Sequence, residues 1–313
     1  MKKSAKFVVS ILAASVLSLS SIGTASAAED AEYAVVLKVL SSEFWQSMKD
    51  GVEKEAEKQG VKVDVYAANT EDDVEGQTTL MENAVNKGYK GIAFAPISPD
   101  NLNPAIAEAT RRNIPVVNID EIVNMDGLNA LGGKVYALVA TDNKDVGRMG
   151  AQFIIDKIGG NGKVAIIEGK AGTKSGEDRR QGATDAFKAA APGIELVESQ
   201  PADWDRTRAY DIATNYLNKY PDLKGIYACN DTMAMGALAA VNASGKQVVV
   251  VGTDGNSDAV ESVKQGNLGA TVRQRPDEIG ARGVQLLMEA VNAKAMPEAP
   301  KQEMIKAELV VKD

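Results

Sequence analysis

The feature that most constrains the fold of this chain is a regular alternation of short apolar runs with amphipathic segments. The apolar run 33–39 is followed by a segment whose apolar residues recur at every fourth position, and then by a second run, 61–66. The recurring residues are Phe44, Met48, Val52 and Ala56. This spacing predicts one face of a helix and therefore a βαβ unit. Runs that are apolar throughout, such as 248–251, are typical of central strands covered on both faces, which predicts an α/β fold with doubly wound parallel sheets.

The same alternation is repeated in the second part of the chain, after a connection at 124–133 that contains Gly and Asn. The expected strands are 33–39, 61–66, 91–95, 114–119, 137–140, 163–167, 194–199, 225–228, 248–252, 270–272 and 307–312. Helices are expected between them, and a final helix near 278–293 precedes the last strand. Two similar halves within 313 residues predict two domains.

Residues 1–27 are predicted to be a secretory signal peptide. Three lysines precede an apolar run, 7–19, and small residues at 25–27 give a cleavage signal before Ala28. No later stretch reaches the ~20 uninterrupted apolar residues of a membrane span, and no cysteine lies near the cleavage site to carry a lipid. We therefore expect a free protein of the bacterial periplasm.

Charge and composition exclude several classes of protein. The formal charge is −8, or −11 once the three lysines of the signal segment are subtracted, so a partner nucleic acid is not expected. The chain has no histidine, which removes histidine bases and histidine metal sites. Cys229 is the only cysteine, so no internal disulfide can form, and we interpret it as a small buried residue at a strand end.

Cofactor and metal motifs are absent from the sequence. The glycine-rich stretch 169–176 does not have Walker spacing, and no G-x-G-x-x-G follows the first strand. The sequence at 124–127 is similar to part of a calcium loop, but Ile122 stands where a ligand is needed. We therefore expect no cofactor, no metal and no catalytic residue.

Polar and aromatic side chains follow the predicted strands, at the sheet edge where open α/β folds bind small ligands. They are Lys38, Ser42, Phe44, Trp45, Asp120, Glu121, Asp142, Glu177, Arg179, Trp204, Asn230, Asp231, Asp254 and Gln274. A sugar needs carboxylates and amides for its hydroxyls, guanidinium donors for its oxygens and aromatic rings for its C–H faces. This set contains all three kinds of group.

Each of these residues also has a structural interpretation. Phe44 and Trp45 taken singly favour core packing. Ser42 and Asp231 are candidate helix N-caps, and for Asp231 the cap is favoured. Asp254 precedes a glycine at a turn, whereas 120–121 and 179–180 are also compatible with solvated surface positions. The prediction of a site therefore depends on their joint placement.

Long stretches of the chain resemble the periplasmic sugar-binding proteins of the ribose- and D-allose-binding type. They are YAVVLK (33–38), Phe44-Trp45, KGIAFAP (90–96), IIEGKAG (166–172), QPADWDR (200–206), NDTMAMG (230–236) and VGTDG (251–255). The resemblance implies two lobes joined by a three-stranded hinge near Thr141, 274–275 and Lys306. It places 28–141 plus 275–306 in the N-terminal lobe, and 142–274 plus 307–313 in the C-terminal lobe.

By the same resemblance, ligand-contacting roles fall on Lys38, Phe44, Trp45, Asp120, Arg179, Trp204, Asn230, Asp254 and Gln274; Ser42 and Glu121 complete the set expected from strand ends. Lys38 matches the allose type, where ribose binders carry a smaller hydroxyl residue. Three positions depart from the family: Ser42 replaces an asparagine, Glu43 a proline and Arg273 a small residue. Arg273 either adds a donor to the site or blocks a sugar hydroxyl.

The expected function is binding of a monosaccharide, a D-allose-like aldohexose or ribose, for an ATP-driven importer. Its expected partners are an inner-membrane permease and, in some bacteria, a chemoreceptor, and the protein is expected to be a monomer. Three alternatives stay open. They are a binding protein of the same fold for a polyol or a furanone-type signal, a glycosidase using Asp120 and Asp254, and a sugar-responsive repressor. The sequence gives neither carboxylate a reason for a raised pKa, and a signal peptide occupies the place of a repressor's DNA-binding segment.

Overall fold

A computed structural model describes residues 31–293 and 295–312. The predicted signal peptide lies outside these residues. Within them, no helix combines the length and the apolar character needed to cross a membrane.

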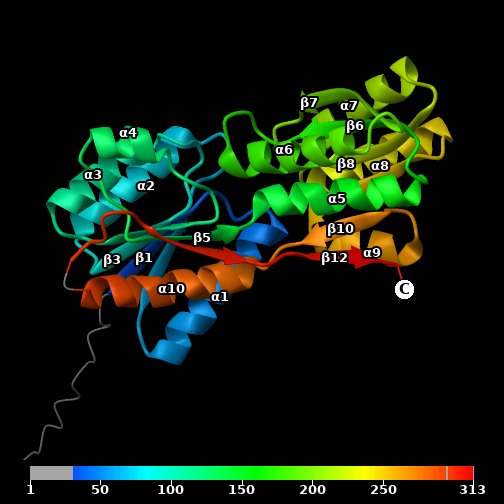
Figure 1. The fold of residues 1–313 in the computed structure, drawn as a ribbon. Coiled ribbons are helices and arrows are strands. Elements are labelled where there is room, and N and C mark those ends of the chain that lie inside the picture. Colours follow the sequence, from blue (N-terminus) through cyan, green and yellow to red (C-terminus); the bar gives the residue numbers. More distant parts are fainter. Residues whose placement is uncertain (1–30, 294, 313) are drawn as a thin grey trace, which may run out of the picture. The chain divides into compact units, whose positions relative to one another are not determined.

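Two six-stranded sheets form the framework (Figure 1). The first has the order β11-β5-β4-β3-β1-β2 and the second the order β12-β10-β9-β8-β6-β7. The first consists of β1 (Tyr33–Leu37), β2 (Val63–Ala67), β3 (Gly91–Phe94), β4 (Val116–Ile119), β5 (Ala137–Thr141) and β11 (Lys301–Ile305). The second consists of β6 (Gly162–Glu168), β7 (Ile194–Pro201), β8 (Leu223–Ala228), β9 (Val249–Asp254), β10 (Ala270–Arg273) and β12 (Glu308–Val311). The predicted α/β class with two sheets is confirmed.

Helices cover both faces of the first sheet. They are α1 (Glu43–Gln59), α2 (Val74–Lys87), α3 (Asn103–Arg111), α4 (Met125–Ala130) and α10 (Pro276–Asn292). Successive side chains of β1 point to opposite faces, so Val35 packs with residues of α1 and α10 whereas Val36 packs with residues of α2 and α3. We call this sheet with its helices the first lobe.

The second sheet is covered by α5 (Asn143–Lys157), α6 (Lys174–Ala189), α7 (Arg206–Lys219), α8 (Asp231–Ser244) and α9 (Ser257–Gln265). Helix α5 packs along α6, and α7 packs along α8. One apolar cluster that includes Phe187, Tyr216 and Tyr227 fills this half, which we call the second lobe. Cys229 is fully buried directly after β8, as predicted.

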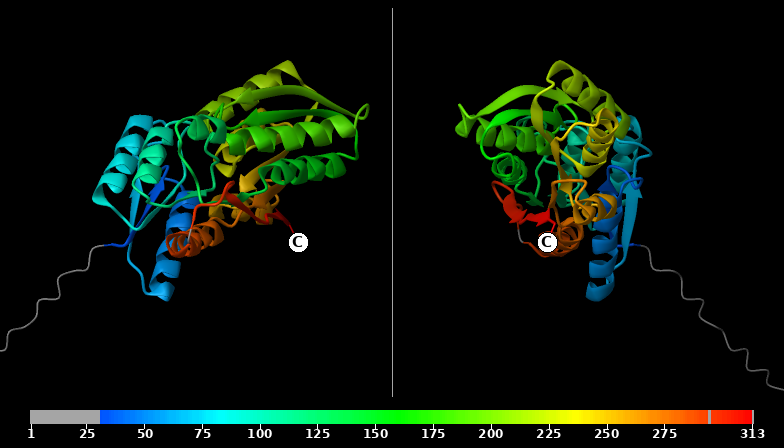
Figure 2. Two further views of the ribbon diagram at one scale, coloured as in Figure 1. Left: turned by 60° about the vertical axis from the view of Figure 1, so that its left-hand side comes forward. Right: turned by 90° about the vertical axis from the view of Figure 1, so that its right-hand side faces the viewer.

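The chain passes between the two sheets three times: from β5 to α5, from β10 to α10, and from β11 to β12. The last two strands, red in Figures 1 and 2, follow one another along the chain from the first sheet to the second. Strand β12 runs antiparallel to β10, so the prediction of purely parallel sheets is wrong at this edge.

Two elements were not predicted. Strand β11 has the polar sequence KQEMI and is largely exposed at a sheet edge, so it carries no apolar run. Helix α4 lies within the 124–133 connection and has only six residues; the Asn124 side chain caps it by accepting the Gly127 N–H. The formation of both elements therefore depends on pairing and packing with neighbouring elements more than on their own composition.

Candidate ligand-binding site

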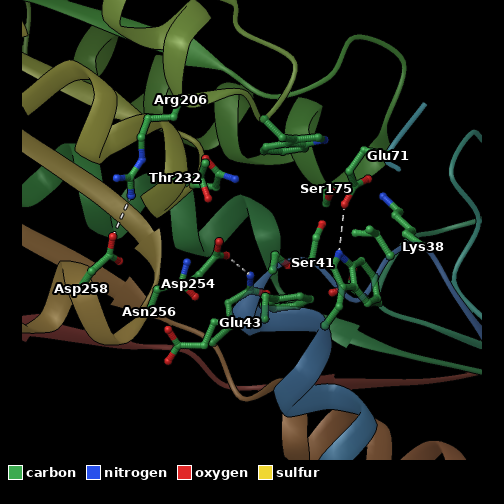
Figure 3. Close-up of a pocket in the computed structure, with 18 of the residues that line it drawn as sticks. Lys38, Ser41, Glu43, Glu71, Ser175, Arg206, Thr232, Asp254, Asn256 and Asp258 are labelled. Atoms are coloured by element: carbon green, nitrogen blue, oxygen red, sulfur yellow. Dashed lines mark hydrogen bonds and ion pairs between the residues drawn. The ribbon is translucent and has the colours of Figure 1, made fainter. Parts of the chain in front are cut away.

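A cavity of about 530 Å³ lies between the two lobes, at the carboxyl ends of strands from both sheets (Figure 3). All the predicted site residues line it except Glu121. Those that line it are Lys38, Ser42, Phe44, Trp45, Asp120, Arg179, Trp204, Asn230, Asp254 and Gln274. Asp142 and Glu177, which also follow strands, are not among the lining residues. Because the parallel strands end at one edge in each sheet, residues far apart in sequence meet there.

The first wall of the cavity is aromatic and comes from the first turn of α1. The rings of Phe44 and Trp45 meet edge to face, with centroids 5.1 Å apart. Trp45 Nε1 donates to Glu71 Oε1 at 3.1 Å, which holds the indole plane (Figure 3). Only 8% of Phe44 and 5% of Trp45 is exposed, and both also belong to the core of the first lobe. Phe44 and Trp45 therefore belong to the core of the first lobe and also line the cavity.

The opposite wall of the cavity carries Trp204, whose indole packs directly against the backbone of two glycines, Gly169 and Gly176. A Cβ added at Gly169 would come within 2.0 Å of the indole, and one at Gly176 within 3.2 Å. The guanidinium carbon of Arg179 lies 5.9 Å from the centre of the same ring. A flat apolar face and a cation therefore stand side by side in the second lobe.

Arg179 is buried and held in place by fixed acceptors. Its Nε donates to Asn143 Oδ1 at 2.8 Å, and Nη1 donates to the carbonyl oxygen of Cys229 at 2.8 Å. Nη1 also lies 3.6 Å from Asp254 Oδ1, to which Gln274 Nε2 donates at 2.7 Å. These contacts orient one cation, one carboxylate and one amide toward the same space.

Two carboxylates of the cavity have raised pKa values. Burial raises the pKa of Asp120 to about 7, although the Lys38 and Arg179 cations oppose the shift. Burial also raises the pKa of Asp254 to about 6, opposed by Arg179 and by the bond from Gln274. The sequence offered no reason for such shifts, and the structure supplies one in burial.

Two residues of the cavity carry a buried side-chain oxygen that has no hydrogen-bond partner within the described part of the chain. Asp120 Oδ1, Gln274 Oε1 and Thr141 Oγ1 are buried without a hydrogen bond, and the first two belong to residues that line the cavity. Buried polar atoms normally have partners. Two acceptors in one cavity indicate a ligand that donates hydrogen bonds.

The backbone is also unusual at the cavity. Asp120, Trp204 and Asp254 have positive φ angles of 58°, 65° and 123°. Residues other than glycine rarely adopt such angles, and they cluster where surrounding structure fixes a functional side chain.

Glu121 lies behind the cavity and contacts it only through other residues. It is fully buried and accepts a bond from Lys38 Nζ at 3.1 Å, which holds the ammonium group of Lys38 at the wall. Burial by itself would raise the pKa of Glu121, but Lys38 and the bonds from Ser175 outweigh it and the net pKa is lowered.

The prediction that Asp231 is a helix N-cap is wrong. Asp231 is not the N-cap of α8; Asn230 is, and its side chain accepts the Met233 N–H at 2.8 Å. Asp231 is instead buried and accepts bonds from Gly255 N–H, Asn256 N–H and the Thr271 hydroxyl, which supports the turn after β9. Ser42 occupies the N-cap position of α1 without a side-chain cap bond.

Arg273 does not line the cavity, so both roles expected for it are wrong. Its Nη1 lies 3.0 Å from Glu308 Oε1, on the exposed side of β10 and β12.

Other lining residues were missed by sequence reasoning. They are Val39, Ser41, Glu43, Glu71, Ser175, Arg206, Thr232, Asn256, Ser257 and Asp258. Glu71 follows β2, a strand whose end was not considered, whereas Asn256 comes shortly after Asp254 at the end of β9, where only Asp254 was chosen. The first-turn serines of α6 and α9 have no comparable signal.

A cavity between two α/β lobes, lined from both sides by aromatic and hydrogen-bonding groups, defines a two-lobed binding protein for a small polar molecule. Residues 33–295 match the periplasmic binding protein domain family, and the chain belongs to this family. It is 52% identical over 291 residues to the D-allose-binding periplasmic protein of Escherichia coli K12, an alignment that covers 91% of this chain and 93% of that protein.

Two further relatives agree with this assignment. The chain is 39% identical over 251 residues to the ribose import binding protein of Bacillus subtilis 168, covering 80% of this chain and 78% of that one. A periplasmic solute-binding protein from Actinobacillus succinogenes 130z, solved with bound D-allose, matches with a TM-score of 0.84 at 33% identity, covering 90% of this chain and 98% of the other.

Proposed function

We propose that this protein is the periplasmic substrate-binding component of an ATP-driven sugar importer and binds a D-allose-like aldohexose or ribose in the cavity between its lobes. The observation that carries the proposal is the cavity itself. Two indole walls from opposite lobes flank a set of oriented cations, carboxylates and amides. A pyranose ring has this combination of apolar faces and hydroxyl edges.

In this proposal each residue has a role set by its chemistry. Phe44 and Trp45 cover one face of the sugar, and Trp204 covers the other. Asp120 and Asp254 accept from hydroxyls, and Arg179 donates to ring or hydroxyl oxygens. Lys38, Ser42, Asn230 and Gln274 complete the polar edge, whereas Glu121 acts through Lys38.

Binding is coupled to closure in this proposal. The lobes are 28–141 plus 275–306 and 142–274 plus 307–313, and they rotate about the three chain crossings. A sugar that contacts both lobes favours the closed arrangement by its differential affinity for it. The closed lobes then present one surface to an inner-membrane permease and, where one exists, to a chemoreceptor. The protein acts as a periplasmic monomer and performs no chemistry on the sugar.

Calorimetry tests the proposal with D-allose, D-ribose, other aldohexoses and pentoses, and myo-inositol as the polyol. We expect one-to-one binding of an aldohexose or ribose, a raised melting temperature and a smaller radius of gyration in solution scattering. No heat and no compaction with any sugar would refute the proposal. Preference for the polyol alone would favour the rival ligand class, and release of nitrophenol from aryl glycosides would favour an enzyme.

A further inference from the structure

Two helices of the second lobe begin without a cap from their own N-cap side chain. Thr173, before α6, and Asn256, before α9, make no side-chain cap bond. In the same lobe Asp142, Asp205 and Asn230 do cap α5, α7 and α8. A helix begins with N–H groups that have no partner within the helix, so α6 and α9 need acceptors from elsewhere.

The first lobe supplies an acceptor to α6. Glu121 Oε1 accepts the Ser175 N–H at 3.0 Å, and Oε2 accepts the Ser175 hydroxyl at 2.6 Å. Glu121 is fully buried and Ser175 is 6% exposed, so solvent does not replace these bonds in the arrangement seen.

The first lobe also supplies an acceptor to α9, with the same chemistry. Glu43, the first residue of α1, accepts the Ser257 N–H at 3.1 Å and 3.0 Å from its two carboxylate oxygens, and Oε2 accepts the Ser257 hydroxyl at 2.7 Å. In both places a glutamate of one lobe bonds the backbone and the hydroxyl of a first-turn serine in the other.

We propose that Glu121 and Glu43 are positioning residues for ligand binding that cap α6 and α9 only when the lobes are closed. Each contact joins two lobes that separate on opening, so each bond is lost when the cavity opens. The carboxylate also meets the positive end of the helix dipole. The two caps therefore favour closure, and they set ligand affinity through the lobes in addition to any direct contact.

Only the predicted effect on sugar affinity rests on the proposed binding function; the predicted effect on lobe closure does not. Glu43 and Ser257 give the cleaner test, because Glu121 also holds Lys38. Glu43→Gln and Ser257→Ala weaken the cap, and Ser257→Thr keeps the hydroxyl. Glu53→Gln is the matched control, since it makes the same charge change on an exposed residue of α1 that pairs with Lys49 of the same helix.

The readout is the distance between the lobes in sugar-free protein. Glu75→Cys on α2 and Lys174→Cys on α6 introduce exposed thiols for spin labels, and the buried Cys229 does not compete for the label. Double electron–electron resonance then measures the distance between the two labels and gives the fraction of closed molecules. We expect Glu43→Gln and Ser257→Ala to lower this fraction, and Ser257→Thr and Glu53→Gln to leave it unchanged.

Affinity for the sugar identified by calorimetry provides the second readout. Loss of the α9 cap should weaken binding about 5-fold, the fold-change that corresponds to the stability a lost helix cap typically costs. The Glu43→Gln/Ser257→Ala double variant should lose less than the sum of the two singles. An unchanged closed fraction in Glu43→Gln and Ser257→Ala would overturn the proposal, whether or not a sugar binds. If no sugar binds but the closed fraction falls as expected, the proposed function fails and the caps stand.

Discussion

Asp120 combines burial, an unpartnered carboxylate oxygen and a left-handed backbone in one residue. Such a carboxylate is costly to ionise without a ligand, because no described residue donates a hydrogen bond to its Oδ1 in place of the water it has lost. A hydroxyl that donates to it removes part of this cost. The free-energy cost of the ionised Asp120 carboxylate is therefore higher in the ligand-free protein than in the complex. This difference favours ligand binding.

Asp120→Asn should stabilise the ligand-free protein in a pH-dependent way. The Asp120 pKa is raised from 3.8 to about 7, so between these values the unfolded chain has already lost the proton that the folded protein keeps. Stability therefore falls as pH rises through this interval. Removing the carboxylate should leave stability nearly unchanged at pH 4 and raise it by at most about 4 kcal/mol at pH 8, since one pKa unit corresponds to about 1.4 kcal/mol.

Urea unfolding of both proteins across this pH range measures the difference. Asn suits the position because it tolerates a φ of 58°. Asp254 and Asp231, whose pKa values are also raised, remain in both proteins. Lys38, Glu121, Arg179 and Asp254 are the charged groups that influence Asp120, and they are also the same in both. A stability difference that does not change between pH 4 and pH 8 would contradict the assignment.

Trp45→Ala should weaken sugar binding strongly and also lower stability, while the protein still melts cooperatively. The side chain is at once a cavity wall and part of the core, so its loss removes a sugar face and leaves a void that costs about 3 kcal/mol or more. Met48→Ala is the matched control. Met48 is fully buried in the same helix and does not line the cavity.

Calorimetric titration and thermal melting of the two variants separate the two roles. Both variants should lose stability, and only Trp45→Ala should lose affinity by a factor of 10 or more, as anchor aromatics do at binding sites. Equal affinity losses in both would mean that Trp45 acts through packing alone.

At the level of elements, α6 is positioned by glycine contacts with α5. A Cβ at Gly182 would lie 1.9 Å from the carbonyl oxygen of Lys144, and one at Gly147 would lie 1.9 Å from that of Arg179. A glycine of each helix therefore packs directly against the backbone of the other helix. This packing places Arg179 at the cavity and the first turn of α6 at Glu121.

Gly182→Ala should push α6 away from α5 and lower both stability and sugar affinity. Overpacking of this kind typically costs about 1–3 kcal/mol. Lys188→Ala, at an exposed position on the same helix, should change neither. Chemical denaturation and calorimetry measure the two effects, and a Gly182→Ala protein as stable as the parent would show that the helix contact yields without cost.

At the level of the whole molecule, the cavity depends on how the three crossings bring two sheets together. Neither lobe forms it alone, because Phe44, Trp45 and Asp120 come from one lobe and Arg179, Trp204 and Asp254 from the other. Lys170 adds a further contact between the lobes, since its Nζ lies 2.6 Å from Asp72 Oδ1. The arrangement described is thus one in which groups from both lobes already face each other.

The sequence by itself determined the alternation of strands and helices, the two halves and most of the cavity wall. Apolar periodicity specifies which residues are buried, and parallel strands place their carboxyl ends at one edge, so the strand-end rule found Lys38, Arg179 and Asp254. Apolar periodicity did not predict strand β11, because this strand is polar and exposed, or helix α4, because this helix is short.

Only the tertiary structure decided what the buried charges do. The pKa of Asp120 depends on loss of water, and the place of Glu121 behind Lys38 depends on packing between residues 83 positions apart. The bond that the Ser257 hydroxyl donates to Glu43 joins residues 214 positions apart. The first contact lies within the first lobe and the second joins the two lobes. Both bring together residues far apart in sequence, and local patterns carry no information about such packing.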